Sequence, residues 1–502
     1  MKKSFLKITI ATLLISLSSN LFSQSLADGL RYSQTLNGGT ARFVSMGGAF
    51  GALGADFTST SINPAGLGVY KSSEFTITPS FKHSSIKSSY NGLSASDSRN
   101  RLLFDNIGIV LSYSPYKSDE NGIINFNIGF GYNRTNDFHS NSIAKGYYDN
   151  SSIIDYFHSK ANSTGLNPDN LGFNSGTDIW DITMAYDTYL LIKYDDVNNE
   201  YIHSLFLGDS VDHENSISTK GGMGVYDISF SMNVSNKLYV GASIGIADYN
   251  FTYDAKYSEW AELNNQRDNN ERFDKLYYAQ FYETKGTGYN FKVGAIYNPI
   301  PSIRIGASIH TPTFYSMTDT YSSSISSEFD SSNVVIKKYS SKSPLGNYDY
   351  DFETPFKFIG SFAYIFQGKG LISIDVERVN YASMKFRNGG DGDNFSDLNM
   401  DAENTFRNVF NFRLGGEYRI CDFALRGGYA FYPSPYKSGF INDKANISQY
   451  SGGVGYRSES FSIDMAYLHT VKKESYVFYS GANPVDTETK DGRFLITLGF
   501  RF

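Results

Sequence analysis

The stretch INFNIGFGY at residues 124–132 decides the fold, because it alternates strictly between apolar residues and asparagine or glycine. Successive side chains of a β-strand point to opposite faces, so this stretch predicts a strand with one apolar face and one polar or small face. The same alternation recurs in LYVGASIGI at residues 238–246 and in FLITLGFRF at residues 494–502. The chain is therefore predicted to consist of strands that meet an apolar environment on one side only.

We count fourteen such segments between residues 73 and 502, and the lengths of their connections alternate. Short links are predicted at 116–121, 235–236, 298–301, 367–369, 420–422 and 457–460. Long loops are predicted near 85–100, 137–217, 258–278, 324–346 and 388–403, with modest ones near 438–443 and 480–485. An outer-membrane barrel has short periplasmic turns at one rim and longer extracellular loops at the other. We therefore expect an all-β fold: a 14-stranded antiparallel transmembrane β-barrel over residues 73–502, with 137–217 as its largest extracellular loop.

The composition agrees with such a barrel in the outer membrane of a Gram-negative cell. Aromatic residues make up 16% of the chain, which suits two aromatic girdles at the membrane interfaces. The single cysteine, Cys421, cannot form an intramolecular disulfide and falls in a predicted short turn. A formal net charge of −7 gives no electrostatic basis for binding nucleic acid.

The N-terminal residues predict a signal peptide followed by a plug. Residues 1–23 contain Lys2, Lys3 and Lys7, then the short apolar run Ile8–Leu17 and a small, polar exit, which is typical of a cleaved secretory signal. No later apolar run reaches about 18 residues, so an α-helical membrane span is not expected. Residues 24–72 are rich in glycine and lack alternation. Because an empty barrel of this size would hold a water-filled channel, we expect them to form an N-terminal hatch inside the lumen.

The hatch segment ends in a turn motif, Asn63-Pro64-Ala65-Gly66-Leu67. Pro64 fixes φ, Gly66 permits a positive φ, and the Asn63 side chain can bond to nearby backbone. In front of the first strand of a fourteen-segment barrel, this motif resembles the hatch of the FadL/TodX family of outer-membrane transporters. The stretch TKGTGYN at 284–290 and the closing GFRF at 499–502 are also similar to that family.

The resemblance implies passive transport of hydrophobic small molecules such as long-chain fatty acids or aromatic hydrocarbons. In this family an extracellular groove captures the ligand, an apolar lumenal pocket receives it, and a kinked third strand releases it sideways into the bilayer. Gly129 and Gly131 are the candidate lateral gate here, because glycine inside a strand weakens pairing and permits a bulge. The alternative is that these two glycines only make room for the hatch.

Four residues of the long loops are candidates for ligand capture. Ile179 and Trp180 lie in 178–192, and Trp260 and Phe273 lie in 258–278, where apolar residues recur at roughly helical spacing. An apolar helix face outside the membrane must be covered by something. The cover is either a ligand or another loop helix, and both alternatives stay open at this point.

The sequence carries no motif for catalysis. HExxH, P-loop and paired CxxC motifs are all absent. The densest metal-like cluster, Asp212-His213-Glu214, is expected to be a solvated charge run and not a metal site. Ser308 and His310 share a strand face, but no third catalytic group is identifiable. We therefore expect no enzyme activity, no cofactor and no metal.

Two functions remain in competition. The first is passive outer-membrane transport, with a hydrophobic small-molecule ligand. The alternative is a FadL-like barrel that acts as a protein-binding platform in secretion, a role for which the 137–217 loop is available. A general porin is disfavoured, because porins keep an open lumen. The expected partners are otherwise outer-membrane lipid, lipopolysaccharide and the barrel assembly machinery; the protein itself is expected to be a monomer that binds no nucleic acid.

Overall fold

The fold was analysed in a computed structural model of the chain. It describes residues 25–36, 38–115, 122–149, 151–174, 179–195, 199–205, 210–262, 272–331, 334–366, 369–392 and 394–502. The predicted signal peptide, residues 1–23, lies outside the described residues.

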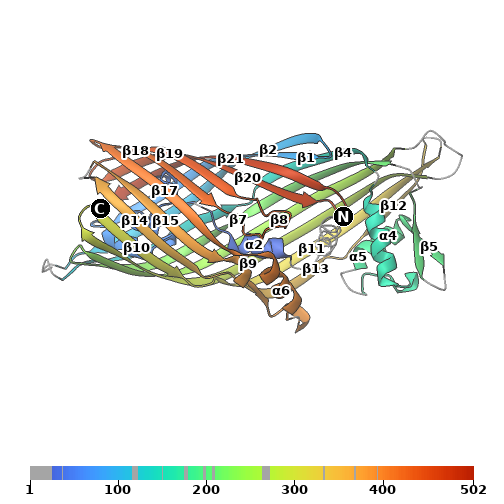
Figure 1. The fold of residues 1–502 in the computed structure, drawn as a ribbon, viewed down its shortest axis with the longest axis horizontal. Helices are drawn as coiled ribbons and strands as arrows, with labels where there is room; N and C mark the ends of the chain where they lie inside the picture. Colours follow the sequence, from blue (N-terminus) through green and yellow to red (C-terminus); the bar gives the residue numbers. More distant parts are fainter. Residues whose placement is uncertain are drawn as a thin grey trace, which may run out of the picture.

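One closed antiparallel sheet forms the wall of the molecule (Figure 1). Its segments are β1 (Glu74–Tyr90), β2 (Leu93–Tyr113), β3 (Ile123–Asp137), β4 (Ser140–Asp149), β7 (Ser210–Val234), β8 (Leu238–Glu262), β9 (Arg272–Ile300), β10 (Ile303–His310), β11 (Phe314–Ser331), β12 (Val334–Lys342), β13 (Gly346–Glu353), β14 (Lys357–Phe366), β15 (Gly370–Asn380), β16 (Lys385–Arg387), β17 (Asn408–Ile420), β18 (Phe423–Tyr432), β19 (Ile447–Arg457), β20 (Phe461–Val477) and β21 (Pro484–Arg501). They make fourteen wall strands, because β3–β4, β10–β11, β12–β13–β14 and β15–β16 are each one interrupted strand. β1 pairs with β21 from Glu74↔Arg501 to Ser89↔Asp486, which closes the barrel. The predicted fold class is confirmed.

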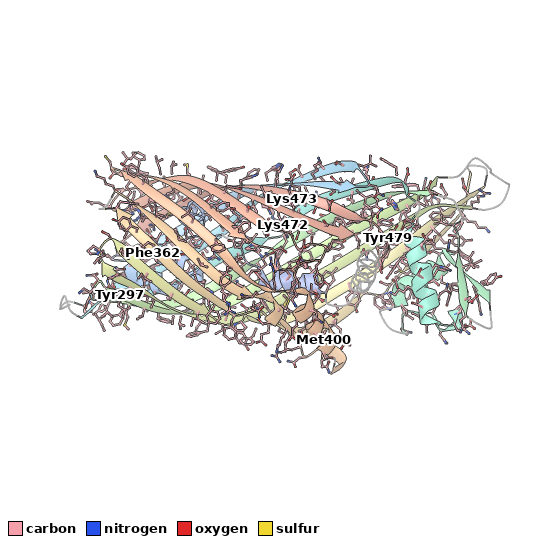
Figure 2. All side chains as sticks on the ribbon, viewed as in Figure 1. Tyr297, Phe362, Met400, Lys472, Lys473 and Tyr479 are labelled. Atoms are coloured by element: carbon pink, nitrogen blue, oxygen red, sulfur yellow. The ribbon has the colours of Figure 1, made fainter. Side chains whose placement is uncertain are left out.

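The alternation read from the sequence sorts the side chains between the two faces of the wall. On β3, Phe126 and Phe130 are each 42% exposed on the outside, while Asn125 and Asn127 are buried toward the lumen. Figure 2 labels Tyr297 and Phe362 on the outer face, and both are exposed aromatic residues of this kind. A wall with apolar side chains outside and polar ones inside is what a bilayer requires of a barrel.

Three of the predicted long loops are wrong, because the strands continue as paired ribbons beyond the expected ends. Instead of a loop at 324–346, β11 continues to Ser331 and pairs with β12, which begins at Val334. Instead of a loop at 85–100, β1 and β2 run up to a tight turn at Asn91 and Gly92, both with positive φ. Instead of a loop at 258–278, β8 continues to Glu262 and β9 begins at Arg272. The alternation fades in these extensions because neither face meets lipid there, so the sequence pattern no longer marks a strand.

The N-terminal segment lies inside the barrel (Figure 1, blue). It contains α2 (Leu26–Ser33), α3 (Ala41–Ser45) and the 3-10 helices η1 (Phe57–Ser61) and η2 (Pro64–Val69). Phe43, Met46 and Phe50 form one buried cluster with Ile359 and Leu495 of the wall. The fit is tight: a Cβ on Gly428 would lie 2.1 Å from the nitrogen of Gly47. We call this segment, residues 25–36 and 38–70, the plug.

Residues 151–174, 179–195 and 199–205 build a small unit on the rim that carries the long loops. Its elements are α4 (Ile153–Thr164), η3 (Pro168–Asn170), α5 (Trp180–Asp187), β5 (Leu191–Asp195) and β6 (Glu200–His203). The short elements η5 (Tyr381–Ser383) and η6 (Gly390–Gly392) and the helix α6 (Ser396–Thr405) occupy the later loops. We call residues 151–174, 179–195 and 199–205 the cap. Among the described helices, none is long and apolar enough to cross a membrane.

Candidate functional site

Asn63 anchors the plug to itself and to the wall. Its Oδ1 accepts a hydrogen bond from the amide of Ala65, capping η2, and Pro64 occupies the first turn, where a missing N–H is tolerated. Its Nδ2 donates to the carbonyl of Gly51 at 2.7 Å and to that of Ala295, on β9, at 3.1 Å. The motif is therefore the start of a 3-10 helix whose capping residue also reaches the barrel wall.

Gly66 is needed for a different reason from the one expected. It does not adopt a positive φ among the described residues; instead, a Cβ there would lie 2.5 Å from Oγ of Ser59 and 3.0 Å from Cα of Gly54. Close approach of two plug segments, and not left-handed backbone, therefore requires glycine at this position.

Gly129 and Gly131 lie in an unbroken part of the wall. Gly129 pairs with Val110 and Ser229, and Gly131 pairs with Gly108 and Asp227, without a shift of register. The expected kink at these two residues is thus not found. Both instead face the plug: a Cβ on Gly129 would lie 2.9 Å from Leu67, and one on Gly131 would lie 2.7 Å from the ring of Phe57. The alternative, room for the hatch, describes their surroundings.

The third wall strand is interrupted beyond Gly131. The register with β7 shifts between Arg134 and Asn136, and Phe138 and His139 separate β3 from β4. The ladder between β2 and β3 stops at Asn106↔Asn133. Beyond that point β4 pairs with β7, and within the described strands no ladder joins it to Leu93–Asp105 of β2, although the two lie close together. We call this break in the ladder the wall gap.

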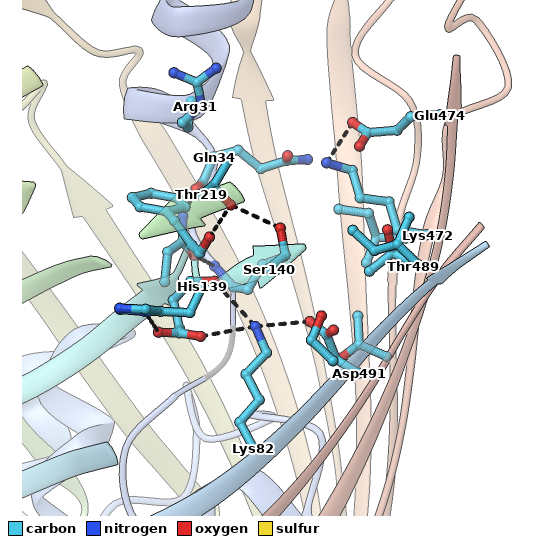
Figure 3. A pocket seen from close by; sticks show the side chains of 18 of the residues that line it. Arg31, Gln34, Lys82, His139, Ser140, Thr219, Lys472, Glu474, Thr489 and Asp491 are labelled. Carbon is cyan, nitrogen blue, oxygen red and sulfur yellow. Dashed lines mark hydrogen bonds and ion pairs between the residues drawn. The ribbon is translucent and has the colours of Figure 1, made fainter. Parts of the chain in front are cut away.

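A lumenal cavity of about 350 Å³ adjoins the wall gap (Figure 3). Its lining includes apolar residues, Leu30 and Leu36 of the plug together with Phe138, Phe251 and Ile447. It also includes charged residues of β1, β3, β20 and β21, namely Lys82, Asp137, Lys472, Glu474, Asp491 and Arg493. The cavity thus offers an apolar surface and a polar surface to one and the same molecule.

The charges around the cavity are organised by Lys82. Its Nζ donates to Asp137 at 2.9 Å and lies 3.1 Å from Asp491. His139 is fixed in the interruption itself: the amide of Gly221 donates to its Nε2, so its Nδ1–H donates to Asp137 at 2.7 Å. This cluster was not predicted from the sequence. The polar run NRTND at 133–137, directly after the alternating stretch, is the signal that marks where the strand changes.

Below the cavity, a second ionic network fixes the plug. The guanidinium of Arg42 donates to the carbonyl of Ala55 at 2.8 Å and lies 3.4 Å from Glu417 of β17. Glu417 accepts from Arg426 at 2.7 Å, and Arg426 donates to Asp464 at 2.6 Å. The described plug is therefore held to three wall strands, β17, β18 and β20, and it occupies the lumen there.

The four candidate capture residues differ in their surroundings. Ile179 and Phe273 are buried in one apolar cluster that joins the cap to β8, β9 and β11. Trp180 is buried beside them, with its Nε1 donating to the carbonyl of Phe173 and its ring 5.7 Å from that of Tyr321. Trp260 lies on β8, opposite Lys275. The expected helical spacing around Trp260 and Phe273 is wrong, because both are on strands, and the packing of loop elements on one another accounts for three of the four residues.

Comparison with known protein families identifies the family of the chain. The profile of the family described as outer membrane protein transport protein (OMPP1/FadL/TodX) matches residues 207–502, more than half of the chain. The chain belongs to this family. Comparison with curated protein sequences finds no match.

Solved structures agree with the OMPP1/FadL/TodX assignment at the level of the fold. A Pseudomonas aeruginosa FadL homologue superposes with a TM-score of 0.55 at 12% identity, covering 94% of this chain and 100% of that one. The Pseudomonas putida toluene transporter TodX gives a TM-score of 0.52 at 14% identity, covering 93% and 99%. The family and the fourteen-stranded fold make the protein an outer-membrane β-barrel, so the short-turn rim is periplasmic and the cap is extracellular.

The structure of this OMPP1/FadL/TodX barrel also places the other residues that the sequence singled out, namely Ser308, His310, the run 212–214 and Cys421. Ser308 and His310 both donate to the carbonyl of Ile62, at 2.6 and 2.9 Å, and so hold the plug. His213 is buried beside Tyr257 and Glu259, so the expected solvated run at 212–214 is wrong for its central residue. Within the described residues, no group of three His, Cys, Asp or Glu side chains is placed to hold a metal. Cys421 is exposed in the predicted turn.

Proposed function

We propose that the protein carries hydrophobic small molecules passively across the outer membrane, from the cap through the lumenal cavity and out sideways through the wall gap. One observation supports this route above all: the cavity adjoins the stretch of the described wall where no ladder joins β4 to the neighbouring β2. The path straight down is occupied by the plug, which Arg42 and Asn63 tie to the wall.

The chemistry of the cavity supports an apolar ligand with a polar end. The apolar part of the ligand leaves water when it packs against Phe138, Phe251 and Ile447. The charged side is already paired internally, since Lys82 contacts two carboxylates. A bare ion would gain little there, because the fixed partners already compensate the charges.

Uptake in cells tests this function directly. The protein is expressed in a host that lacks its own transporter, and accumulation of a labelled long-chain fatty acid and of a labelled monoaromatic hydrocarbon is measured. Ala27 is exposed in the cavity, so Ala27→Trp should fill it and lower accumulation, whereas Ala27→Ser should not. If neither compound accumulates above the empty-vector level with the unchanged protein, the proposed function is wrong.

A second candidate, a protein-binding platform in secretion, is favoured by one feature of the cap. Its two-stranded sheet presents Ile192, Tyr194 and Ile202 at 42%, 69% and 43% exposure. Exposed apolar residues gathered on one face suit protein binding. Capture of a defined secreted protein by the native barrel, lost in Ile192→Asp with Ile202→Asp while uptake is kept, would favour this function instead.

A further inference from the structure

We propose that Arg99 and Arg134 form an arginine gate that closes the wall gap and controls the lateral step. The expected consequence for transport, faster passage when the two arginines are replaced, rests on the proposed function. The structural part of the proposal, that these two side chains hold β2 against β4 and β7, can be tested without any transport.

The wall gap leaves main-chain groups of β2 without strand partners close to the membrane. Leu102 and Phe104 lie on this stretch and are 79% and 62% exposed on the outer face, as expected for residues that meet lipid. Peptide groups at that level must find partners, because lipid offers none and an unsatisfied peptide group there is strongly unfavourable. Some other donor has to replace the missing ladder.

Arg99 crosses the gap from the β2 side. Its Nη1 donates to the carbonyl of Thr219, on β7, at 3.0 Å. The same nitrogen lies 3.3 Å from Oδ1 of Asn141, on β4, and 3.2 Å from Oγ of Ser218. One side chain thus contacts both strands on the far side of the break.

Arg134 crosses the gap in the opposite direction. Its Nε donates to the carbonyl of Phe104, on β2, at 3.1 Å and lies 3.9 Å from Oδ1 of the fully buried Asp105. Gly222 leaves the space that this side chain needs, since a Cβ there would lie 2.6 Å from Nη1 of Arg134. The two arginines therefore act from the two edges of the break, each bonded to a carbonyl of the other edge.

Arginine suits this task because its guanidinium offers several donors in a fixed plane and stays charged. A side-chain contact also differs from a ladder in how it opens. Rotating two side chains separates the edges, whereas opening a ladder breaks consecutive main-chain bonds together. The gap can therefore widen for a ligand and close again without loss of strand pairing elsewhere.

Pulsed electron paramagnetic resonance on the full-length protein tests the arginine gate. Nitroxide labels are attached at Ser96→Cys on β2 and Tyr147→Cys on β4, both exposed positions. The background carries Cys421→Ser, because the native cysteine is exposed. The test variants are Arg99→Ala, Arg134→Ala and Arg99→Lys. The control is Arg101→Ala: Arg101 is an exposed arginine two residues from Arg99 and, among the described residues, bonds to no group across the gap.

The expected result is a longer and broader label distance in both alanine variants, with Arg101→Ala unchanged. Loss of two charge-assisted contacts should raise the open fraction by about tenfold and the uptake rate with it. Arg99→Lys should lie between, because lysine keeps the charge but is a compact point donor without the planar fork; it also serves if an alanine variant fails to fold. If the label distances are unchanged in both Arg99→Ala and Arg134→Ala, the arginine gate is wrong even where uptake is normal. If Arg99→Ala fails to fold, unchanged distances in Arg134→Ala and Arg99→Lys have the same meaning. Absence of uptake with the native protein overturns the proposed function and leaves the distances to decide on the gate.

Discussion

Lys82 on β1 reaches past β2 to Asp137 at the end of β3, with 2.9 Å between Nζ and Oδ2. The two strands are not neighbours in the wall, so the contact forms inside the lumen. Asp491 of β21 receives the same ammonium group at 3.1 Å. The interrupted strand is thereby tied to the strands that close the barrel, at the edge of the cavity (Figure 3).

Lys82→Met should destabilise the barrel by roughly 3 kcal/mol, because it leaves Asp137 and Asp491 close together without the cation between them. The methionine keeps most of the side-chain volume, so the loss is mainly electrostatic. Thermal unfolding in detergent, followed by the shift in electrophoretic mobility between folded and unfolded barrel, measures the change. Lys490→Met is the control, since Lys490 is 55% exposed beside Glu488 and its ion pair should contribute little. Equal transitions for the two variants would contradict a structural role for Lys82.

Gly131→Ala should lower stability by about 1–3 kcal/mol, the usual cost of forcing extra volume into a packed site. The added Cβ would lie 2.4 Å from the carbonyl oxygen of Ile107 and 2.7 Å from the ring of Phe57, and the backbone contact cannot be relieved by rotating a side chain. Gly360→Ala on β14 is the matched control, because nothing lies within 4 Å of its added Cβ. Unfolding midpoints in urea compare the two. A stable Gly131→Ala protein with altered uptake would restore the view of Gly131 as a gate.

The wall could be predicted from the sequence because residues that meet lipid alternate along each strand with residues that face the lumen. In 124–132 each apolar residue meets lipid and each asparagine or glycine faces the lumen. This periodicity ends where the strands leave the membrane, so the tight turn at Asn91 and Gly92 was predicted as a loop.

The site was predicted less well, because its contacts join residues that are distant in the sequence and carry no local pattern. Asn63 was found through its turn chemistry, yet its partner Ala295 could not be. Gly129 and Gly131 were predicted to form the lateral gate because glycine permits a bulge in a strand. In the structure, the absence of a Cβ instead leaves room for Leu67 and Phe57 of the plug.

Asn63→Ala should loosen the plug without preventing barrel assembly. The substitution removes the cap on Ala65 and leaves the carbonyls of Gly51 and Ala295 without this donor, which costs about 1–3 kcal/mol locally. Asn63→Asp separates the two roles, because a carboxylate can still cap η2 but cannot donate. Faster amide hydrogen exchange in residues 51–70 is expected in both variants, with the cap of η2 retained in the second. Asn388→Ala, at an exposed loop position, should leave that segment unchanged, and protection equal to the native level in Asn63→Ala would show that Asn63 does not hold the plug.

Ile179→Asp with Trp180→Asp should disrupt the extracellular cap and leave the barrel intact. Both side chains are buried, at 4% and 5% exposure, and Ile179 belongs to the apolar cluster of the cap, so the change removes two carboxylates from water. We expect rapid proteolytic cleavage within 151–205 in outer-membrane preparations, together with weaker ligand capture, while the heat-induced mobility shift of the barrel persists. Ile192→Asp, at an exposed position of the same cap, is the control and should resist the protease as the native protein does. Weaker capture without any gain in cleavage would mean that Ile179 and Trp180 contact the ligand themselves, and it would favour the groove over simple packing of the loop elements.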